Sequence, residues 1–377
     1  MPETPSIAAI EISHHRLPLD PPFRASWDGR PRTAFDATIV RVRDSEGRVG
    51  IGSGDLMLGF AGHEGLFLGQ DPRAHDRHYE VLSHIAFHYG RCWPLDLALW
   101  DLAGKIAGAP VWRLLGGASG RVKLYASSGV LRSPQALADR AEQALAEGFA
   151  AMKIRFSSAG EGRGGWRADI AALEAVRARI GDRMALMVDC NQGWRMPWDT
   201  AAPWGFKDAL EVARALEPLG IFWMEEPLHR ADIAGMAALR AASPIRIAGG
   251  EMTREAAAFR QIVEARALDI LQPDAALTEG ITGLARVARM ARAAGLGFTP
   301  HSWTNGIGVL ANAHLLAGTG ADLWLEFPHD PPEWSLERRD FPMAAPLAAA
   351  AGTLELGEAP GFGLALDEAR LAATRIG

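Results

Sequence analysis

From about residue 122 onward the chain repeats one unit, made of a short apolar run, a polar end, a loop and an amphipathic helix. The eight apolar runs are VKLYASS, AMKIRF, ALMVDCN, IFWMEEP, IRIAGGE, LDILQPD, GFTPHSW and LWLEFP. Short apolar strands that alternate with helices predict a parallel sheet that is buried on both faces. Eight such units are the number that closes a (β/α) barrel, so we expect an α/β fold with a barrel as its main part.

The helices between these strands have recognisable ends. Ser133 and Pro134 can cap and start one helix, because the serine side chain accepts from free backbone N–H groups. Gly148 can end that helix, since glycine tolerates the left-handed C-terminal turn, and a second helix ends in the same way near Gly295. The last unit is expected to lack a full helix, because the proline-rich FPHDPPEW follows its strand.

Length and composition limit the class of protein. A chain of 377 residues is long for one core, which predicts a second domain beside the barrel. The net charge of -6 argues against nucleic-acid partners. No apolar stretch approaches the length of about 18 residues that a membrane span needs, and no secretory signal is evident, so we expect a cytoplasmic protein without a membrane partner. Cys92 and Cys190 are too few for a disulfide framework and are expected to be free thiols.

From the second strand onward, the apolar runs end in polar side chains at regular intervals. Successive steps are 36, 36, 26, 23, 27 and 25 residues, each about one strand, one helix and their loops. The C-terminal ends of barrel strands converge at one end of the barrel, where such barrels have their active sites. We therefore expect these side chains to meet there: Lys153, Asp189, Glu225, Glu251, Asp274, His301 and Glu326.

Three of these residues, Asp189, Glu225 and Glu251, are acids from successive strands. Three carboxylates at one point repel one another unless a cation neutralises them. Because they offer only oxygen ligands, the pattern favours Mg²⁺ as the cofactor. Glu226, the neighbour of Glu225, is expected to point elsewhere, since adjacent strand residues face opposite ways.

Short motifs occur in a fixed order along nearly the whole chain, and the ordered set is specific although each motif is weak alone. They are KIR (153–155), VDCNQGW (188–194), MEEP (224–227), GGE (249–251), QPD (272–274), PHSW (300–303) and LEFP (325–328), together with LALWDLAGKIAGAPVWRLLGG (97–117) and PGFGLALDE (360–368). In this order they resemble the enolase superfamily, mandelate racemase subgroup.

The resemblance implies a two-part fold. It predicts an α+β capping domain made of residues 1–120 and completed by the C-terminal tail, 341–377. This domain would cover a modified TIM barrel of the (β/α)7β type, residues 121–340, which agrees with the missing last helix. The family also implies a homo-oligomer.

The resemblance further implies the chemistry. In the family, the three acids bind Mg²⁺, the metal holds the substrate carboxylate, and loss of the proton alpha to that carboxylate gives an enediolate. Lys153 is expected to supply a positive contact to the carboxylate. Glu326 is expected to donate a hydrogen bond to the developing oxyanion if it is protonated. Such contacts accelerate the reaction only if they are stronger in the transition state than in the ground state.

His301 is the candidate base, because the ordinary pKa of histidine lies near neutrality and Asp274 can hold the ring and fix its tautomer. Asn191, two residues beyond Asp189, is expected to orient a ligand. Arg155 stands where racemases of this subgroup often have a lysine base. Guanidinium, with a pKa above about 12, is a poor proton shuttle, so two-base racemisation is disfavoured. Arg155 is instead expected to bind substrate oxygens or to help hold the metal site.

A one-base reaction remains, in which His301 takes the alpha proton and returns a proton to a departing beta hydroxyl. That reaction is syn dehydration of a sugar acid to a 2-keto-3-deoxy acid, which predicts a hydro-lyase acting on a small-molecule carboxylate. The alternative is a racemase, epimerase or cycloisomerase that uses Lys153 with His301 through the same enediolate. A non-catalytic binding protein is disfavoured, because neither a metal ligand nor His301 is lost.

Substrate specificity is expected in two loops of the capping domain, residues 14–31 and 52–64. Arg24 and Trp27 are candidates to contact a polyol or a second carboxylate. The LMLGF segment within the second loop would suit a less polar group.

Two further features have simpler interpretations. GEGRGG, residues 160–165, fits the dinucleotide fingerprint, with Asp189 24 residues beyond it. The preceding run AMKIRF carries two charges that a central strand of a dinucleotide-binding sheet would lack, so we expect a loop instead. Trp194 and Trp303 are expected to pack rather than to recognise a ligand.

Overall fold

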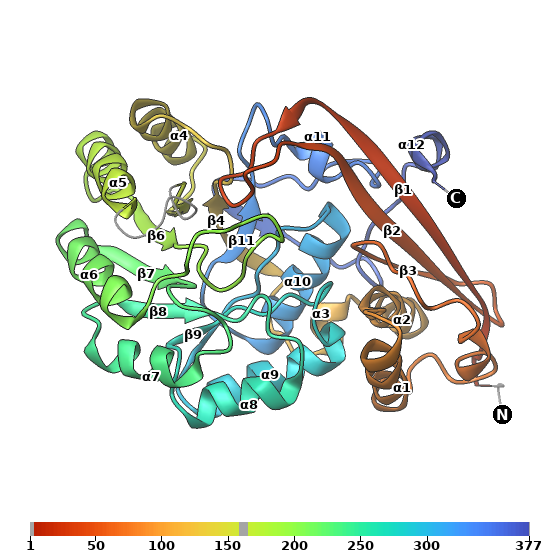
Figure 1. The fold of residues 1–377 in the computed structure, drawn as a ribbon. Coiled ribbons are helices and arrows are strands. Elements are labelled where there is room, and N and C mark those ends of the chain that lie inside the picture. Colours follow the sequence, from red (N-terminus) through yellow and green to blue (C-terminus); the bar gives the residue numbers. More distant parts are fainter. Residues whose placement is uncertain (1–3, 158–164, 377) are drawn as a thin grey trace.

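The computed structural model describes residues 4–157 and 165–376. Within them the strands form a three-stranded sheet and a nine-stranded sheet. Figure 1 shows the larger sheet with its helices on one side of the molecule and the smaller sheet on the other. Residues 158–164 lie outside the described residues, and with them all of the GEGRGG segment except Gly165.

Eight strands of the larger sheet are parallel and coincide with the eight predicted apolar runs, with β4 beginning one residue before its run. They are β4 (Arg121–Ser127), β5 (Ala151–Arg155), β6 (Ala185–Asp189), β7 (Ile221–Glu225), β8 (Arg246–Gly249), β9 (Ile270–Leu271), β10 (Gly297–Phe298) and β11 (Leu325–Pro328). Their order is β10-β9-β8-β7-β6-β5-β4-β11, so the last strand lies beside the first. This is the strand succession of a barrel and has no reversal point, which makes the dinucleotide-binding alternative wrong.

The two ends of this strand order approach each other through side chains. Thr299 Oγ1, just after β10, donates to the carbonyl of Trp324, just before β11, across 2.6 Å. The backbone N–H of Ser302 donates to Glu326 Oε2 of β11 at 2.8 Å. These contacts join the two edges of the curled sheet.

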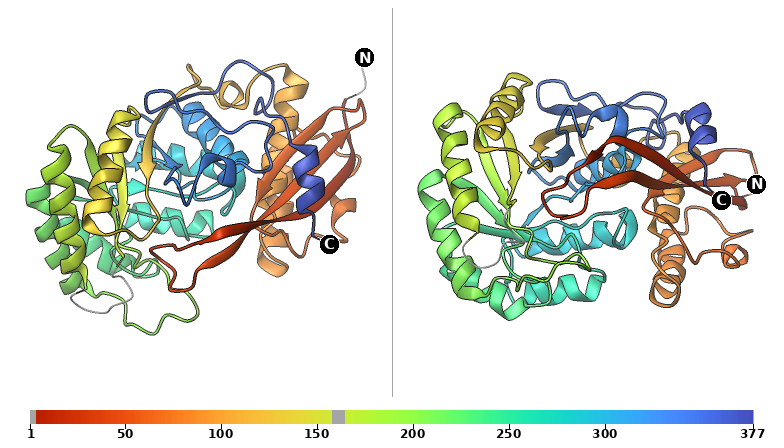
Figure 2. Two further views of the ribbon diagram at one scale, coloured as in Figure 1. Left: turned by 90° about the horizontal axis from the view of Figure 1, so that it is seen from above. Right: turned by 45° about the horizontal axis from the view of Figure 1, so that its top comes forward.

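A helix follows each of the first seven parallel strands and covers the outer face of the sheet (Figures 1 and 2). The helices are α4 (Pro134–Ala146), α5 (Trp166–Ile180), α6 (Phe206–Leu216), α7 (Ile233–Ala242), α8 (Ala256–Glu264), α9 (Gly280–Ala293) and α10 (Gly306–Thr319), with the 3-10 turn η2 (Glu217–Leu219) after α6. After β11 there is only the four-residue α11 (Leu336–Arg339). The predicted (β/α)7β barrel is thus confirmed, including its short last unit.

Local sequence signals set the helix ends as predicted. Ser133 accepts a hydrogen bond from the backbone N–H of Ala136, and Pro134 is the first helical residue. Gly148 follows the helix with a φ of 88°, a conformation that glycine adopts without steric cost.

The smaller sheet is antiparallel and consists of β1 (Ile7–Phe23), β2 (Arg32–Asp44) and β3 (Val49–Gly54). It packs on α2 (Trp93–Ala107), with η1 (Glu64–Leu66) and α1 (His75–His88) beside them. The close approach requires glycine, because a Cβ atom at Gly52 would lie 1.9 Å from the Pro94 carbonyl oxygen. Together these elements form the expected α+β layer next to the barrel, and Figure 2 shows it from two further directions.

The C-terminal tail connects both parts. β12 (Thr353–Glu355) pairs antiparallel with β4, whereas α12 (Glu368–Thr374) lies against β1. Asp101 of α2 accepts from the backbone N–H groups of Ile51 and Phe362, both at 2.7 Å, and so ties the tail to β3. The short α3 (Val111–Leu114) leads from α2 into the barrel. The limits given above for the two domains remain predictions.

The inside of the barrel holds a layer of apolar side chains. One buried residue comes from each of the strands β4 to β9: Tyr125, Ala151, Met187, Trp223, Ala248 and Ile270. Because strand side chains alternate between faces, the residues two positions further along also point inward. They lie closer to the C-terminal ends of the strands.

Among the described residues, no helix is long and apolar enough to cross a membrane. Cys92 and Cys190 are buried free thiols, as expected.

Candidate active site

The layer above the apolar layer is polar. Two residues beyond the apolar positions of five strands stand Ser127, Lys153, Asp189, Glu225 and Gln272, all of them fully buried. Period-two alternation therefore places polar side chains from five of these strands at the C-terminal end of the barrel, whereas the corresponding residue after β8 is Gly250.

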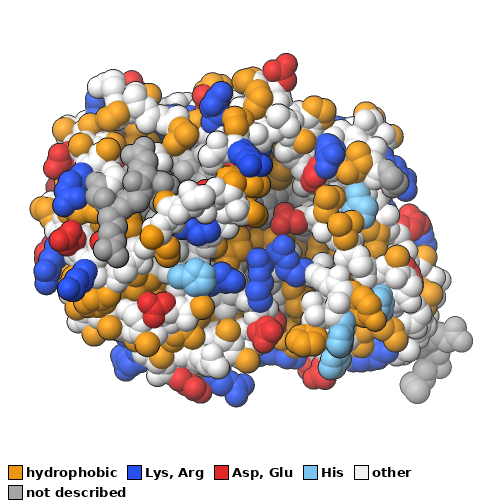
Figure 3. Space-filling model, in the orientation of Figure 1, with side chains coloured by type: hydrophobic (Ala, Val, Ile, Leu, Met, Phe, Trp, Pro, Cys, Tyr) orange, Lys and Arg blue, Asp and Glu red, His pale blue; other side chains and the backbone are white. Residues whose placement is uncertain are grey.

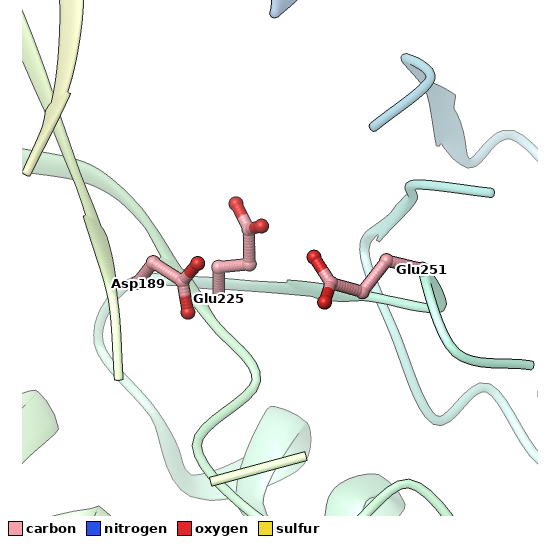
Figure 4. A group of neighbouring side chains, drawn as sticks. All are labelled: Asp189, Glu225 and Glu251. Atoms are coloured by element: carbon pink, nitrogen blue, oxygen red, sulfur yellow. The ribbon is translucent and has the colours of Figure 1, made fainter. Parts of the chain in front are cut away.

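Asp189, Glu225 and Glu251 converge as predicted. All three are buried, and each offers a carboxylate oxygen that lies within 4.8 Å of those of the other two. Figure 4 shows Asp189 and Glu225 on neighbouring strands, with Glu251 facing them from the opposite side. Burial, together with Asp189 and Glu326, raises the pKa of Glu225 to about 7, although Lys153 lowers it. The carboxylate of Glu225 is thus only partly compensated by Lys153.

The donor set fits a hard divalent cation. It consists only of carboxylate oxygens, which Mg²⁺ prefers. Glu251 Oε2 is buried and accepts no hydrogen bond within the described part of the chain, although His301 Nε2 lies 3.2 Å from it. This oxygen would be available to coordinate a cation held by the three acids.

Lys153 is fully buried against the acids. Its Nζ atom lies 2.6 Å from Glu225 Oε1, 2.8 Å from Glu326 Oε1 and 3.8 Å from Asp189 Oδ2. Burial alone would lower the pKa of this ammonium group, but Glu225 and Glu326 raise it above its ordinary value. Lys153 is consequently a fixed positive charge.

Arg155 is a second fixed cation. Its Nη1 atom donates to Asp189 Oδ2 at 2.5 Å and to Asn191 Oδ1 at 3.2 Å, and Nη2 lies 3.4 Å from Glu326 Oε1. Burial opposes the charge, but Asp189 and Glu326 raise the pKa of Arg155 above its ordinary value. Its guanidinium carbon lies 4.6 Å from the centre of the Trp27 ring.

His301 faces the acids from the other side. Its Nδ1 atom lies 2.9 Å from Asp274 Oδ2, and Asn312 Nδ2 donates to the other oxygen of Asp274 at 3.0 Å. Nε2 lies 3.2 Å from Glu251 Oε2. Burial lowers the pKa of the ring, but the carboxylates of Glu251, Glu326 and Asp274 outweigh it and raise the pKa to about 9. One ring nitrogen is thus held by Asp274, and the other points into the site.

Glu326 accepts hydrogen bonds through both oxygens. Oε1 accepts from Ser127 Oγ at 2.7 Å and from Lys153, and Oε2 accepts from the backbone of Ser302. Burial would raise its pKa, but Lys153, His301 and Arg155 hold it below its ordinary value. The donor role expected for Glu326 required a protonated carboxyl group, and this arrangement disfavours that state.

Asn191 lies beside Asp189 in a left-handed backbone conformation, with a φ of 50°. Its Nδ2 atom donates to the Phe156 carbonyl at 3.2 Å, and its Oδ1 atom accepts from Arg155. Asn191 therefore holds Arg155 in place, and its expected contact with a ligand remains a prediction.

The structure brings one of the two expected loop residues to the site. Trp27 lines a cavity of about 490 Å³ together with Asn191 and Trp194. Arg24 is exposed and does not line this cavity, so the structure does not support the contact that we expected from it.

Two tryptophans near the strand ends also donate hydrogen bonds to residues of the site, and the expectation that they do not recognise a ligand stays a prediction. Trp194 Nε1 donates to Glu251 Oε1 at 2.8 Å, and Trp303 Nε1 donates to Ser127 Oγ at 2.8 Å. Gln272, which sequence reasoning also missed, donates to Glu225 Oε2 at 2.8 Å. The signal that could have found them is their place in the motifs VDCNQGW, PHSW and QPD.

Glu226 lies outside the group of three acids, as expected. Its φ of 48° turns the chain directly after β7. The side chain lies against Gly193, where a Cβ atom would be 2.3 Å from Glu226 Oε1. A side chain at 193 would therefore displace the carboxylate of Glu226.

Comparison with known proteins gives the following relatives. The family model described as "Enolase C-terminal domain-like" matches residues 136–370. A D-galactarolactone cycloisomerase from Agrobacterium fabrum is 30% identical over 389 residues, which cover 97% of each chain. An L-talarate/galactarate dehydratase from Salmonella typhimurium is 30% identical over 340 residues, covering 84% of this chain and 80% of that protein.

Solved structures agree with these relatives. A racemase from Streptomyces coelicolor A3(2), whose crystal structure has bound magnesium, superimposes with a TM-score of 0.82 at 28% identity. The match covers 98% of this chain and 100% of that one. The racemase shares its fold with this chain, and the names of the three relatives describe three different reactions.

Proposed function

The chain belongs to the enolase superfamily, and on this premise we propose that it is a Mg²⁺-dependent enzyme that removes the proton alpha to a substrate carboxylate. Within this class we propose dehydration of a sugar acid to a 2-keto-3-deoxy acid. The single observation that carries the proposal is the geometry of His301, whose Nδ1 is bound to Asp274 while Nε2 faces the three acids.

The physical difficulty of the reaction lies in charge. Loss of a proton next to an ionised carboxylate puts a second negative charge on the same group. Asp189, Glu225 and Glu251 would hold Mg²⁺, which when bound supplies positive charge to that carboxylate. Lys153 adds a fixed positive charge on the same side, already in place before the reaction begins.

His301 would act as the base and then as the acid. The Asp274 contact keeps a proton on Nδ1. Glu251 is the carboxylate that most raises the pKa of the ring, so a cation held by Glu251 would lower that pKa and leave Nε2 free to accept the alpha proton. The resulting imidazolium is stabilised by the carboxylates of Asp274 and Glu251. It can then give a proton to a beta hydroxyl that leaves as water from the same face.

A cycloisomerase or an epimerase is the second candidate. Of these two, the similarity to the D-galactarolactone cycloisomerase over nearly the whole chain favours a cycloisomerase. Epimerisation requires a second base on the opposite face. Lys153 and Arg155 occupy that region as cations whose pKa values are raised, which supports dehydration over epimerisation.

The test is a screen of acid sugars with Mg²⁺, read by formation of 2-keto acid and, in deuterated solvent, by exchange of the alpha hydrogen. We expect a 2-keto-3-deoxy acid from at least one sugar acid, no product with a chelator present, and no turnover by His301→Asn. Exchange without water loss would assign an epimerase or cycloisomerase instead. Unchanged turnover by His301→Asn would remove His301 from the mechanism and the proposal with it.

A further inference from the structure

A buried carboxylate just beyond β11 holds the loop between β4 and α4. Asp330 is fully buried, and its Oδ2 atom accepts from the backbone N–H groups of Gly129 and Val130, both at 2.8 Å. The same oxygen accepts from Arg132 Nη1 at 2.7 Å. Because a buried N–H group that loses a charged acceptor costs free energy, these three donors fix the loop against the segment after β11.

The carboxylate of Asp330 is itself held in place. Arg140 of α4 is buried, and its Nε atom lies 3.6 Å from Asp330 Oδ1. Arg140 Nη2 donates to the His329 carbonyl at 3.0 Å. The backbone of Asp330 pairs with that of Trp334 in both directions, at 3.0 and 3.1 Å. Two arginines and its own backbone thus fix this carboxylate.

The loop between β4 and α4 supports the turn between β1 and β2, residues 24–31, which we call the capping turn. Ala25 forms an antiparallel bridge with Val130, and the Gly129 carbonyl accepts from the backbone N–H of Ser26 at 2.9 Å. Figure 1 shows the capping turn reaching from the smaller sheet to the barrel beside β4, and Figure 3 shows a hollow near the middle of the same face. The capping turn therefore rests on backbone that the buried carboxylate fixes.

Gly129 also lies against two indole rings. A Cβ atom at 129 would be 2.4 Å from Trp303 Cη2 and 2.8 Å from Trp27 Cζ3. The centres of the two rings are 4.8 Å apart, and the rings meet edge to face. Trp27 in turn lies over the guanidinium group of Arg155, 4.6 Å from its ring centre. A shift of Gly129 would therefore move Trp27 relative to the site.

We propose that Asp330 is a positioning residue, which holds the capping turn closed over the site and so keeps Trp27 over Arg155. The proposal rests on the proposed function, because it assumes that the substrate binds among the candidate catalytic residues. If the turn were free to open, only a fraction of the molecules would have the closed site. The apparent dissociation constant of the substrate would then rise by the inverse of that fraction, while bound substrate would react at the same rate.

The first test is the split between KM and kcat. Asp330→Ala leaves two buried N–H groups without an acceptor, so we expect KM to rise about tenfold or more, with kcat and Mg²⁺ affinity within about twofold of wild type. Asp330→Asn keeps an acceptor oxygen but loses the charge, so its KM should lie between the two, and it replaces the alanine variant if that variant does not fold. Unchanged KM in both variants, or a loss of kcat at constant KM, would overturn the proposal.

Asp44 provides a matched control. It is buried and likewise accepts from two backbone N–H groups, those of Glu46 and Arg48, and from an arginine side chain, Arg48 Nε. It lies at the end of β2 remote from the capping turn. Asp44→Ala should have the KM of the wild type. An equal rise of KM in Asp44→Ala and Asp330→Ala would indicate general destabilisation and contradict the positioning role.

A double-mutant cycle tests whether Asp330 acts through Trp27. Trp27→Ala removes the ring that the capping turn places over the site. If Asp330 acts by positioning this ring, adding Asp330→Ala to Trp27→Ala should raise KM no further. Additive effects of the two substitutions on KM would refute this route.

Proteolysis without substrate separates this proposal from the proposed function. Trypsin can cleave after Arg24, an exposed residue whose carbonyl accepts from the Leu131 backbone N–H at 3.3 Å, and local opening raises the rate of such cleavage. We expect cleavage there to be about tenfold faster in Asp330→Ala than in wild type, and unchanged in Asp44→Ala. That result would support the closed turn even if the reaction class proved different. Equal rates in all three proteins would exclude it even if the enzyme dehydrates a sugar acid.

Discussion

Arg155 Nη1 donates to Asp189 Oδ2 across 2.5 Å. The side chain that stands at the second-base position of the KIR motif is thus bound to a candidate metal ligand. It carries a guanidinium group whose pKa is raised by Asp189 and Glu326. The imidazole of His301 lies across the site and has both ring nitrogens next to carboxylates. The site therefore has one side chain suited to take a proton and two fixed cations.

The first prediction concerns stereochemistry. Because Arg155 and Lys153 stay charged, only His301 can exchange the alpha proton. Substrate recovered from deuterated solvent should carry deuterium at the alpha carbon without inversion, as measured by NMR and chiral chromatography. Any epimer at that carbon would require a second base and contradict the prediction, and His301→Asn should show no exchange at all.

The second prediction concerns the indole that supports the metal site. Trp194→Phe removes the N–H group that donates to Glu251 Oε1. Loss of a hydrogen bond to a metal ligand costs about tenfold to a hundredfold in metal affinity. We therefore expect weaker Mg²⁺ binding by calorimetry, with the fold intact by circular dichroism. The control is Trp324→Phe, just before the N-terminal end of β11. Equal affinities in the two variants would argue against a role for Trp194.

The third prediction separates the roles of Asp274 and the metal ligands. In Asp274→Asn, the contact with Asn312 favours an amide oxygen at that position, so the amide nitrogen faces His301 Nδ1. The histidine proton then moves to Nε2, which can no longer accept one. We expect kcat to fall by about a hundredfold or more, with Mg²⁺ affinity unchanged. Asp322→Asn, an exposed acid, should have full activity, and a parallel loss of metal binding in Asp274→Asn would assign it a different role.

The fourth prediction tests how the tail is anchored. Asp101 accepts from Ile51 N, Phe362 N and Lys105 Nζ, each at 2.7 Å. Asp101→Ala leaves two buried N–H groups without acceptors and should lower the free energy of unfolding by about 3 kcal/mol or more. Urea denaturation measures the change. Asp76→Asn, which removes an exposed ion pair with Arg286, should have a much smaller effect.

The fifth prediction concerns acid stability. His314 is buried in α10, its Nδ1 atom accepts from Trp112 N at 3.1 Å, and burial lowers its pKa to about 3. Between the ordinary value of 6.5 and about 3, the unfolded chain binds a proton that the folded protein does not. Stability is thus complete above about pH 6.5 and falls on acidification by up to about 1.4 kcal/mol per pH unit.

The comparison for this effect is His314→Asn, whose amide oxygen can replace Nδ1 as the acceptor. This variant should have a flatter dependence of unfolding free energy on pH below neutrality. His88→Asn, at an exposed position, should have the same slope as the wild type. Identical slopes in all three proteins would exclude His314 as the source.

The strands and the three acids could be predicted because their signals are local. Each apolar run is a strand by its own composition, and the period-two alternation that buries Met187 and Trp223 also turns Asp189 and Glu225 inward. Regular spacing along the chain then becomes proximity in space, since every unit adds one strand to the same sheet.

The rest depended on contacts between distant segments. The indole of Trp194 reaches Glu251 only because of the path of the chain after β6, which no local pattern specifies. The exposed position of Arg24 follows from the turn between β1 and β2. The pairing of β12 with β4, and the contacts of Asp330 with Gly129 and Val130, likewise exist only in the assembled fold.

The first strand of the barrel receives its neighbours at very different times during synthesis. β4 pairs with β5, which follows it closely, and along its other edge with β11 from near the end of the chain, and β12 also joins it. Until the ribosome has made those segments, one edge of β4 has no hydrogen-bonding partner. Edges of this kind are sites of unwanted association, so nascent chains of this protein are expected to depend on chaperones until translation reaches β12.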